Sequence, residues 1–159
     1  MKENEKRKEG DSNSLVSLDI LKKHLLEHHH LSAVQINEFV QSEIAIPVSC
    51  FNEKLSILES VVKFLKEEQD FNYHKIGLML ERDERNIWTT YANSQKKMKA
   101  KLDVSSSIRI PISEFKNEAG LFAAVKYLKE NLDVTYHKIG VLLSRDERTI
   151  WITYNKKSK

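Results

Sequence analysis

The chain has 159 residues and a net charge of +3, with 40% hydrophobic and 31% charged residues and only four glycines and two prolines. This hydrophobic content excludes wholesale disorder, and the scarcity of helix breakers favours helices joined by short turns. The single cysteine, Cys50, excludes an internal disulfide, and no apolar run reaches the roughly 20 residues of a membrane helix. We therefore expect a soluble, cytoplasmic, all-α protein with no membrane partner, whose modest charge argues only weakly for nucleic acid.

The N-terminal part divides into a polar tail and an amphipathic segment. Residues 1–14 are rich in Lys, Glu, Asn and Ser without periodicity, which predicts a disordered tail. Residues 15–43 carry two apolar stripes at helical spacing, separated by a Ser32-x-x-Gln35 capping box, which predicts a helical hairpin. His24 lies one helical turn before the His28-His29-His30 run, but no carboxylate or cysteine cluster completes a metal site, so we interpret these histidines as a solvated helix end.

The rest of the chain is duplicated. When the sequence is shifted by 63 residues, 20 of the 30 positions from Val62 to Tyr91 recur between Val125 and Tyr154. The repeated text is Tyr-His-Lys-Ile-Gly, followed by Arg-Asp-Glu-Arg and Ile-Trp. Two copies of one unit are therefore expected. Units of about 50 residues are individually marginal, so we expect them to pack on one another or on a partner.

Each copy opens with an Ile-Pro-x-Ser segment, which begins at Ile46 in the first copy and at Ile110 in the second. Proline disfavours helix in the residue before it, so an extended start is expected. A first helix follows, and in the first copy it begins at a capping box formed by Ser56 and Glu59. The apolar stripes of the two first helices are Leu58, Val61, Val62 and Leu65, and Leu121, Ala124, Val125 and Leu128.

Two further helices follow in each copy. Asn72 and Thr135 stand where an N-cap is expected, ahead of brief helices over residues 73–80 and 136–143. Asp83 and Asp146 are the expected N-caps of a third helix, which ends in a basic stretch. The predicted organisation is a disordered tail (1–14), a helical hairpin (15–43), a first three-helix domain (44–100), a serine-rich linker (101–107) and a second three-helix domain (108–159).

Three short helices with a turn of three to four residues between the second and the third describe a helix-turn-helix. Gly77 and Gly140 lie on the second helix where a side chain larger than a methyl group is expected to collide with the crossing third helix. The ten-residue interval from Gly77 to Ile87 matches the interval between the small residue and the aliphatic residue of the bacterial-type motif. The sequence therefore predicts two tandem helix-turn-helix domains behind the hairpin.

At these positions the chain resembles region 4 of the sigma-70 family and the related homeodomain-like regulators. Residues 73–80 and 136–143 look like the supporting helix, and residues 83–97 and 146–159 look like the recognition helix with a basic exit. The sequence departs from the family pattern at two positions of each turn. Glu81 and Ser144 stand where many members have a glycine, and Arg82 and Arg145 stand where they have an aliphatic residue.

The resemblance implies that the third helix enters the major groove of duplex DNA, with the start of the second helix against the backbone. Ile87 and Tyr91 are four residues apart and face the core, which leaves the other side chains of this helix outward. The residues expected to contact bases are Arg85, Asn86, Thr89, Asn93, Arg148, Thr149, Ile152 and Lys156. The two arginines are candidates for reading guanine, because the guanidinium fork fits O6 and N7 together. Outward differences between the copies predict half-sites of unlike sequence.

Basic side chains near the ends of these helices are expected to contact phosphates, which positions the protein without specifying a sequence. They are His74, Lys75, Lys96, Lys97, His137, Lys138, Lys157 and Lys159. No catalytic residue, metal ligand or cofactor is predicted, because neither copy presents a nucleophile with a base or a metal-binding cluster. We expect a nucleoid-associated transcriptional regulator whose partner is double-stranded DNA, with RNA polymerase and self-association through the hairpin as further candidates.

Two residue types admit more than one interpretation. An aromatic residue beside a core aliphatic on a short helix is more often buried than base-contacting, so Trp88 and Trp151 are predicted to be core residues. The turn arginines, Arg82 and Arg145, suit a surface ion pair and a phosphate contact equally well.

The alternative function is a protein–protein interaction module without direct DNA readout. Three-helix units also bind proteins, and Glu81, Asp83 and Glu84 crowd the start of the third helix. Salt distinguishes the two functions, because the affinity for DNA falls steeply with ionic strength and that of a hydrophobic protein contact does not.

Overall fold

The computed structural model describes residues 44–157 continuously and, before them, residues 20, 23, 24, 26, 27, 31, 32 and 34–36. The predicted tail and most of the predicted hairpin, including the His28-His29-His30 run, lie outside the described residues. The capping box predicted in the hairpin is confirmed: Ser32 Oγ accepts from Gln35 N at 3.2 Å, and Gln35 Oε1 accepts from Ser32 N at 2.9 Å. Among the described residues, no helix is both long and apolar enough to cross a bilayer.

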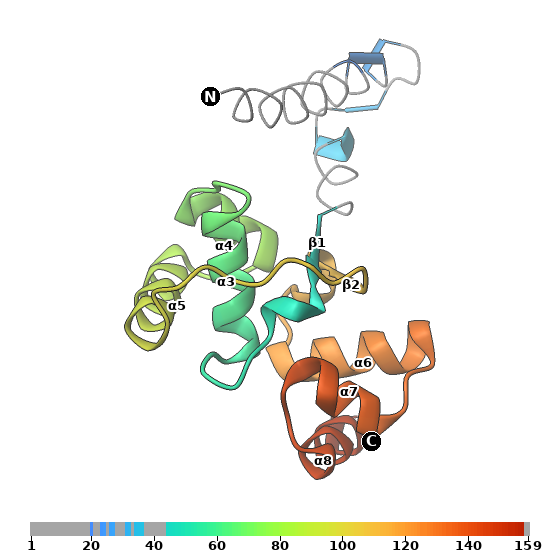
Figure 1. Cartoon of the computed structure of the whole chain (residues 1–159). Helices are drawn as coiled ribbons and strands as arrows, with labels where there is room; N and C mark the ends of the chain where they lie inside the picture. Colours follow the sequence, from blue (N-terminus) through green and yellow to red (C-terminus); the bar gives the residue numbers. More distant parts are fainter. Residues whose placement is uncertain are drawn as a thin grey trace, which may run out of the picture. The chain divides into compact units, whose positions relative to one another are not determined.

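Both repeats contain a strand, a 3-10 turn and three helices, in that order (Figure 1). In the first repeat these are β1 (Ala45–Pro47), η1 (Val48–Cys50), α3 (Ile57–Glu67), α4 (Tyr73–Leu80) and α5 (Glu84–Lys97). In the second repeat they are β2 (Arg109–Pro111), η2 (Ile112–Phe115), α6 (Gly120–Leu132), α7 (Tyr136–Leu143) and α8 (Glu147–Lys157). The expected all-α class is therefore confirmed for the part of the chain that the structure describes.

Local capping residues set where these helices begin. Ser56 and Glu59 form the predicted capping box at the start of α3, with Ser56 Oγ 3.1 Å from Glu59 N. The other predicted N-caps also accept helix N–H groups: Asn72, Thr135, Asp83 and Asp146. Each cap satisfies an amide that helix geometry leaves without an internal partner, so these starts are determined by nearby sequence.

The carboxylate of Glu59 at this capping box is buried and accepts from Lys97 Nζ at 2.8 Å and from Ser56 N at 2.8 Å. Burial opposes its ionisation, but the Lys97 ammonium and the Ser56 amide outweigh burial and hold the pKa of Glu59 below its usual value near 4.5. A carboxyl group with a lowered folded pKa stabilises the fold above its unfolded pKa. This contribution is lost as the pH falls through the folded pKa.

We therefore expect Glu59→Gln to lower the free energy of unfolding at neutral pH by about 1 kcal/mol, as the loss of a helix cap does. The difference between wild type and variant should shrink as the pH falls below about 4.5, because this carboxyl group is protonated first in the unfolded chain and, at lower pH, in the folded protein. Urea unfolding at neutral pH and at about pH 3 measures both effects. The exposed carboxylate of Glu53 provides a control, since Glu53→Gln should leave stability unchanged at neutral pH. A Glu59→Gln deficit that stays constant across this pH range contradicts the assignment.

The opening segments of the two repeats pair with each other. β1 and β2 run antiparallel, with Ile46 directly opposite Ile110. These two isoleucines are the equivalent first residues of the Ile-Pro-x-Ser segments. An antiparallel pair of equivalent strands centred on equivalent residues has a local two-fold axis through its centre.

The two repeats share one core. Each opening segment crosses to the other repeat, so that η1 packs on α7 and η2 packs on α4, while α3 packs on α6. The buried apolar side chains form a continuous cluster that contains residues of both repeats, from Ile46 to Ile150. Where the sequence predicts two domains with a linker, residues 42–159 thus form a single compact unit. Sharing a core increases the surface that each marginal unit buries.

The predicted linker, residues 101–107, runs along the first repeat in fixed contact with it. Leu102 is buried. Ser49 Oγ donates to Asp103 O at 2.8 Å and accepts from Ser106 N at 3.0 Å. Because the linker is held by these bonds, the connection between the repeats adds little freedom to their arrangement.

A polar network inside the first repeat ties α3 to α5. Lys63 on α3 is fully buried, and its ammonium lies 2.8 Å from Glu67 Oε1. The same oxygen accepts from Tyr91 OH at 3.1 Å and from Gln95, both on α5. Burial and the Glu67 carboxylate raise the pKa of the Tyr91 hydroxyl. The network orients α5, the helix that the sequence predicts to meet DNA.

The turn between the second and third helices combines a left-handed residue with a close backbone approach. Glu81 and Ser144 have φ angles of 52° and 53°, in the region that favours glycine. A Cβ atom on Gly77 or Gly140 would lie 2.7 Å or 2.6 Å from a carbonyl oxygen of the turn. The collision expected at the two glycines is present, and the first group to collide is the turn rather than the third helix itself.

Replacing Glu81 by glycine should raise the free energy of unfolding by about 0.5–1 kcal/mol, because a left-handed non-glycine residue is strained. The Glu81 side chain contributes little in return, since its ion pair with Lys116, at 3.8 Å, is solvent-exposed. Leu78→Gly is the matched control: Leu78 is exposed within α4, where glycine should instead lower stability by about 1 kcal/mol. Urea unfolding of the two variants should shift in opposite directions; a shift in the same direction contradicts the strain at Glu81.

Candidate nucleic-acid interface

The outward face of α5 carries the polar side chains that the sequence predicts there. Ile87 and Ser94 are buried, and the ring of Tyr91 lies 6.0 Å from that of Tyr73 at the start of α4. This inward stripe leaves the opposite side of the helix to solvent. All four predicted base-contacting residues of this repeat are exposed: Arg85, Asn86, Thr89 and Asn93.

The second repeat presents the same arrangement on α8. Ile150 is buried, and the ring of Tyr154 lies 6.0 Å from that of Tyr136, with nearly the same tilt as in the first repeat. The predicted base-contacting residues are exposed at Arg148, Thr149 and Lys156, and half-buried at Ile152. The two candidate surfaces therefore differ in side chains but share one backbone geometry.

The prediction that the two tryptophans belong to the core is wrong. Trp88 is 56% exposed and Trp151 is 53% exposed. Each indole lies one position after the buried isoleucine, about 100° around the helix from it, and so falls at the edge of the inward stripe. The 3-10 segment of each repeat packs on the second helix of the other repeat, and η2, which packs on α4, includes the buried Phe115. This packing joins residues that are far apart in the sequence, and the apolar pattern of a single helix does not predict it.

Each exposed indole borders a surface recess at the start of its helix. The recess on α5 has a volume of about 530 Å³ and is lined by Tyr73, Asp83, Glu84, Arg85 and Trp88. The recess on α8 has a volume of about 450 Å³ and is lined by Tyr136, Asp146, Glu147, Arg148 and Trp151. The five positions are the same in both repeats. The sequence analysis did not include the tryptophans among the candidate site residues. Their recurrence near Arg85 and Arg148 in both repeats could have indicated such a role.

Several predicted phosphate contacts lie beside carboxylates. The Nδ1 atoms of His74 and His137 lie 3.4 Å and 3.2 Å from the carboxylates of Glu84 and Glu147. All four of these side chains are exposed. The acidic partners follow the N-caps of α5 and α8, where a negative charge stabilises the helix dipole. Both histidines therefore have a carboxylate partner in the absence of DNA.

The predicted lysine contacts fall into three groups. Lys97 pairs with Glu59 at 2.8 Å, and Lys157 pairs with Glu118. The ammonium of Lys75 lies 3.6 Å from the centre of the Phe71 ring. Lys96 and Lys138 are exposed, and Lys159 lies outside the described residues.

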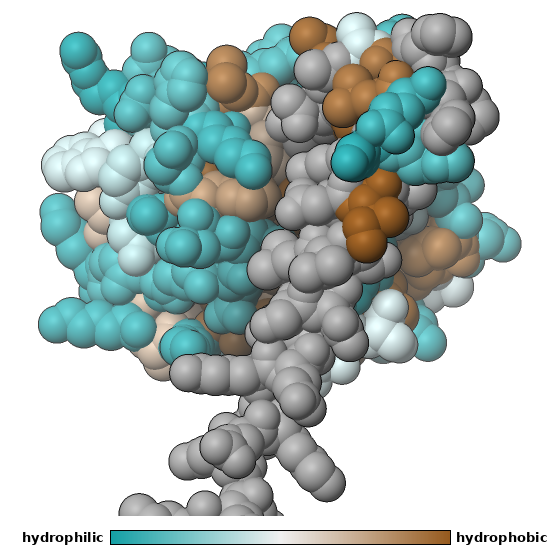
Figure 2. All heavy atoms as spheres, turned by 90° about the horizontal axis from the view of Figure 1, so that it is seen from above, coloured by the Kyte–Doolittle hydropathy of each residue, from teal (hydrophilic) through white to brown (hydrophobic). Residues whose placement is uncertain are grey.

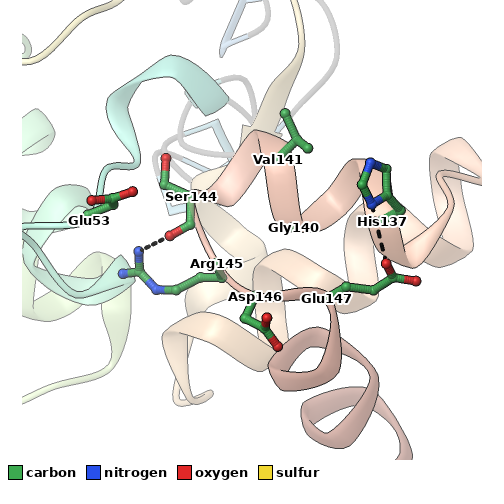
Figure 3. Close-up of a pocket in the computed structure, with 8 residues that line it drawn as sticks. All are labelled: Glu53, His137, Gly140, Val141, Ser144, Arg145, Asp146 and Glu147. Atoms are coloured by element: carbon green, nitrogen blue, oxygen red, sulfur yellow. Dashed lines mark hydrogen bonds and ion pairs between the residues drawn. The ribbon is translucent and has the colours of Figure 1, made fainter.

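The ion-pair interpretation of the turn arginines is wrong for the described residues, because their guanidinium groups donate to main-chain carbonyls of the other repeat. Arg145 donates to Asn52 O at 2.9 Å and to Leu55 O at 2.7 Å, both in the first repeat. Arg82 donates to Glu118 O in the second repeat at 2.7 Å. Figure 3 shows Arg145 directed toward the first repeat, away from the His137–Glu147 pair. These arginines hold the two repeats together and do not form part of the outward face.

The recess drawn in Figure 3 lies at this junction and has a volume of about 730 Å³. Its lining combines the carboxylates of Glu53, Asp146 and Glu147 with His137 and with Arg145, whose guanidinium already donates to carbonyls of the first repeat. Elsewhere, hydrophilic side chains cover most of the coloured surface of the face seen in Figure 2, with smaller hydrophobic patches between them. The outward faces of α5 and α8 remain the candidate nucleic-acid surfaces.

Comparison of the chain with protein-family models, curated proteins and solved structures found no match.

Proposed function

We propose that this protein is a sequence-specific, double-stranded DNA-binding protein and a transcriptional regulator acting at the nucleoid. In this proposal α4 with α5, and α7 with α8, are two helix-turn-helix motifs. The third helix of each, α5 or α8, enters the major groove. Its outward side chains meet base edges, while the start of the second helix lies against the phosphate backbone.

The proposal rests on one observation above the others: α5 and α8 expose equivalent positions at three of the four predicted base-contacting pairs, led by Arg85 and Arg148. The connecting turns support it, since three residues separate Leu80 from Glu84 and the same number separates the equivalent helices. Neither arginine makes a side-chain ion pair among those described, and a free guanidinium fork is suited to guanine O6 and N7.

Acidic side chains lie near the starts of α5 and α8. Glu84 and Glu147 are exposed, and each lies beside an exposed histidine. A nearby phosphate would repel these carboxylates, so in this proposal they oppose close approach of the phosphate backbone to the starts of α5 and α8. Exposed Lys96, Lys138 and Lys156 supply positive charge along the same surfaces.

A protein–protein interaction module is the second candidate, and the recesses beside Trp88 and Trp151 favour it. Exposed aromatic side chains next to carboxylates suit a cationic side chain of a protein partner. In that case the tryptophans would carry the affinity, and Arg85 and Arg148 would be dispensable.

Selection from random duplex DNA, followed by binding measurements on the selected sequences, tests the proposal. We expect Arg85→Ala and Arg148→Ala each to weaken binding to the selected site by about 1–3 kcal/mol and to relax preference at separate positions. Arg109→Ala is the matched control, because Arg109 is an exposed arginine on β2 and its loss changes net charge equally. If both helix variants keep the wild-type preference, or weaken binding no more than Arg109→Ala does, the base-reading assignment is wrong.

A further inference from the structure

We infer that the DNA site of this protein is an inverted repeat with one fixed spacing between its half-sites, covered by a single chain. This inference rests on the proposed function and specifies the ligand of that site. Two tandem domains on a flexible linker would follow one another along the duplex and read a direct repeat. The contacts between the repeats exclude that arrangement within residues 42–159.

The main-chain bonds around the β1–β2 ladder, the antiparallel strand pair that joins the two repeats, are reciprocal. Val48 N donates to Ile108 O at 3.0 Å, and the equivalent Ile112 N donates to Ile44 O at 2.8 Å. Each bond joins one repeat to the other, and exchanging the repeats converts one bond into its counterpart. The ladder is therefore symmetric about the pair of central isoleucines, as a two-fold axis requires.

The same symmetry extends to the helices. η1 packs on α7 and η2 packs on α4, which is one contact made twice with the repeats exchanged. The turn arginines behave in the same way: Arg82 reaches the opening segment of the second repeat at Glu118 O, and Arg145 reaches that of the first repeat at Leu55 O. Symmetry at the ladder, at the 3-10 segments and at the turns relates the two repeats as whole bodies.

A two-fold axis that relates the repeats also relates α5 to α8. In Figure 1, α5 lies at the left edge and α8 at the lower edge, both apart from the β1–β2 pair. A two-fold rotation leaves the position along its axis unchanged, so the two helices lie at the same level along the axis. Duplex DNA has local two-fold axes perpendicular to its length, and a protein that aligns with one reads half-sites on opposite strands. Such half-sites form an inverted repeat.

The shared core fixes the spacing of the half-sites. α5 packs on α3, α8 packs on α6, and α3 packs on α6, so a continuous set of packed helices joins the two candidate recognition helices. Close-packed interiors do not deform to follow a change in ligand spacing. Adding about 5 bp between the half-sites rotates one of them to the far side of the duplex, and the two helices then no longer bind together.

The two half-sites are expected to be related but not identical. Thr89 on α5 is equivalent to Ile152 on α8, and Asn93 is equivalent to Lys156. A hydroxyl and an aliphatic group favour different base edges, as do an amide and an ammonium. The inverted repeat should thus be imperfect, with the shared positions read by the two arginines.

The test uses the full chain and synthetic duplexes built from the two half-sites obtained by selection. Four arrangements of the same half-sites are compared by fluorescence anisotropy: inverted at the selected spacing, direct, inverted with about 5 bp added, and one half-site replaced by random sequence. We expect the inverted duplex to bind at least about 100-fold more tightly than the other three, as intramolecular binding at a second site allows. Analytical ultracentrifugation should give one chain per duplex.

The outcomes separate this inference from the proposed function. Equal or tighter binding to the direct repeat, unchanged binding after the insertion, or two chains on each inverted repeat would overturn the inference and leave DNA binding intact. Selection that yields no duplex at all would overturn both. The Arg85→Ala and Arg148→Ala variants assign each half-site to its helix, and each should lose preference in one half-site alone.

Discussion

Replacing Arg145 by alanine should lower the free energy of unfolding by about 3 kcal/mol. The Arg145 guanidinium donates to Asn52 O and Leu55 O of the other repeat, and to Leu143 O and Ser144 O of its own turn. Hydrogen bonds from a charged donor contribute about 1.5–3 kcal/mol each, and their removal leaves half-buried carbonyls unsatisfied. Urea unfolding followed by circular dichroism measures the loss.

Three further variants serve as controls for this prediction. Arg148→Ala removes an exposed arginine three residues away and should change stability by less than about 0.5 kcal/mol. Arg82→Ala should fall between the two, because Arg82 makes a single bond to the other repeat and its Nε is buried without a partner. Arg145→Lys should recover only part of the loss, since an ammonium does not span both carbonyls. Equal stability of Arg145→Ala and Arg148→Ala would show that the junction does not depend on this arginine.

Gly140→Ala is the second large effect that we expect, with a loss of about 2 kcal/mol in the free energy of unfolding. Alanine normally stabilises a helix by about 1 kcal/mol relative to glycine. Here the added Cβ would lie 2.6 Å from the carbonyl oxygen of Arg145, a backbone atom that moves only with the turn. Overpacking of this kind typically costs about 1–3 kcal/mol and exceeds the gain in helix propensity.

The neighbouring residue supplies the control for this prediction. Val141 is exposed on the same helix, and Val141→Ala should be neutral or slightly stabilising because alanine is the better helix former. Gly77→Ala should reproduce the loss in the first repeat, where the corresponding distance is 2.7 Å. A gain in stability for both glycine variants would show that the turn moves freely, and would contradict the close packing of the second and third helices.

Features that depend on a few adjacent residues were predicted correctly. The N-caps Asn72, Thr135 and Asp83 and the bounds of α4 and α7 follow from side chains that bond to amides two or three residues away. The exposure of Arg85 and Arg148 follows in the same way from the helical period and the buried isoleucines.

Features that depend on the meeting of the two repeats were not predicted. Trp88 is exposed, and the 3-10 segment η2 that packs on the second helix of its repeat belongs to the other repeat. Arg82 and Arg145 point inward because carbonyls of the other repeat lie within reach. These contacts join residues up to 93 positions apart, so they cannot be predicted from local patterns in a single sequence.

The dependence of DNA affinity on salt is the most direct measurement of whether the two outward helices bind a duplex. For the selected duplex, the logarithm of the association constant should fall linearly with the logarithm of the salt concentration, by about 0.9 for each phosphate neutralised. With roughly five phosphates neutralised, the slope is near −4.5. Arg85→Ala should weaken binding at every salt concentration. A slope close to zero, with affinity unchanged in Arg85→Ala and Arg148→Ala, would contradict DNA binding by α5 and α8.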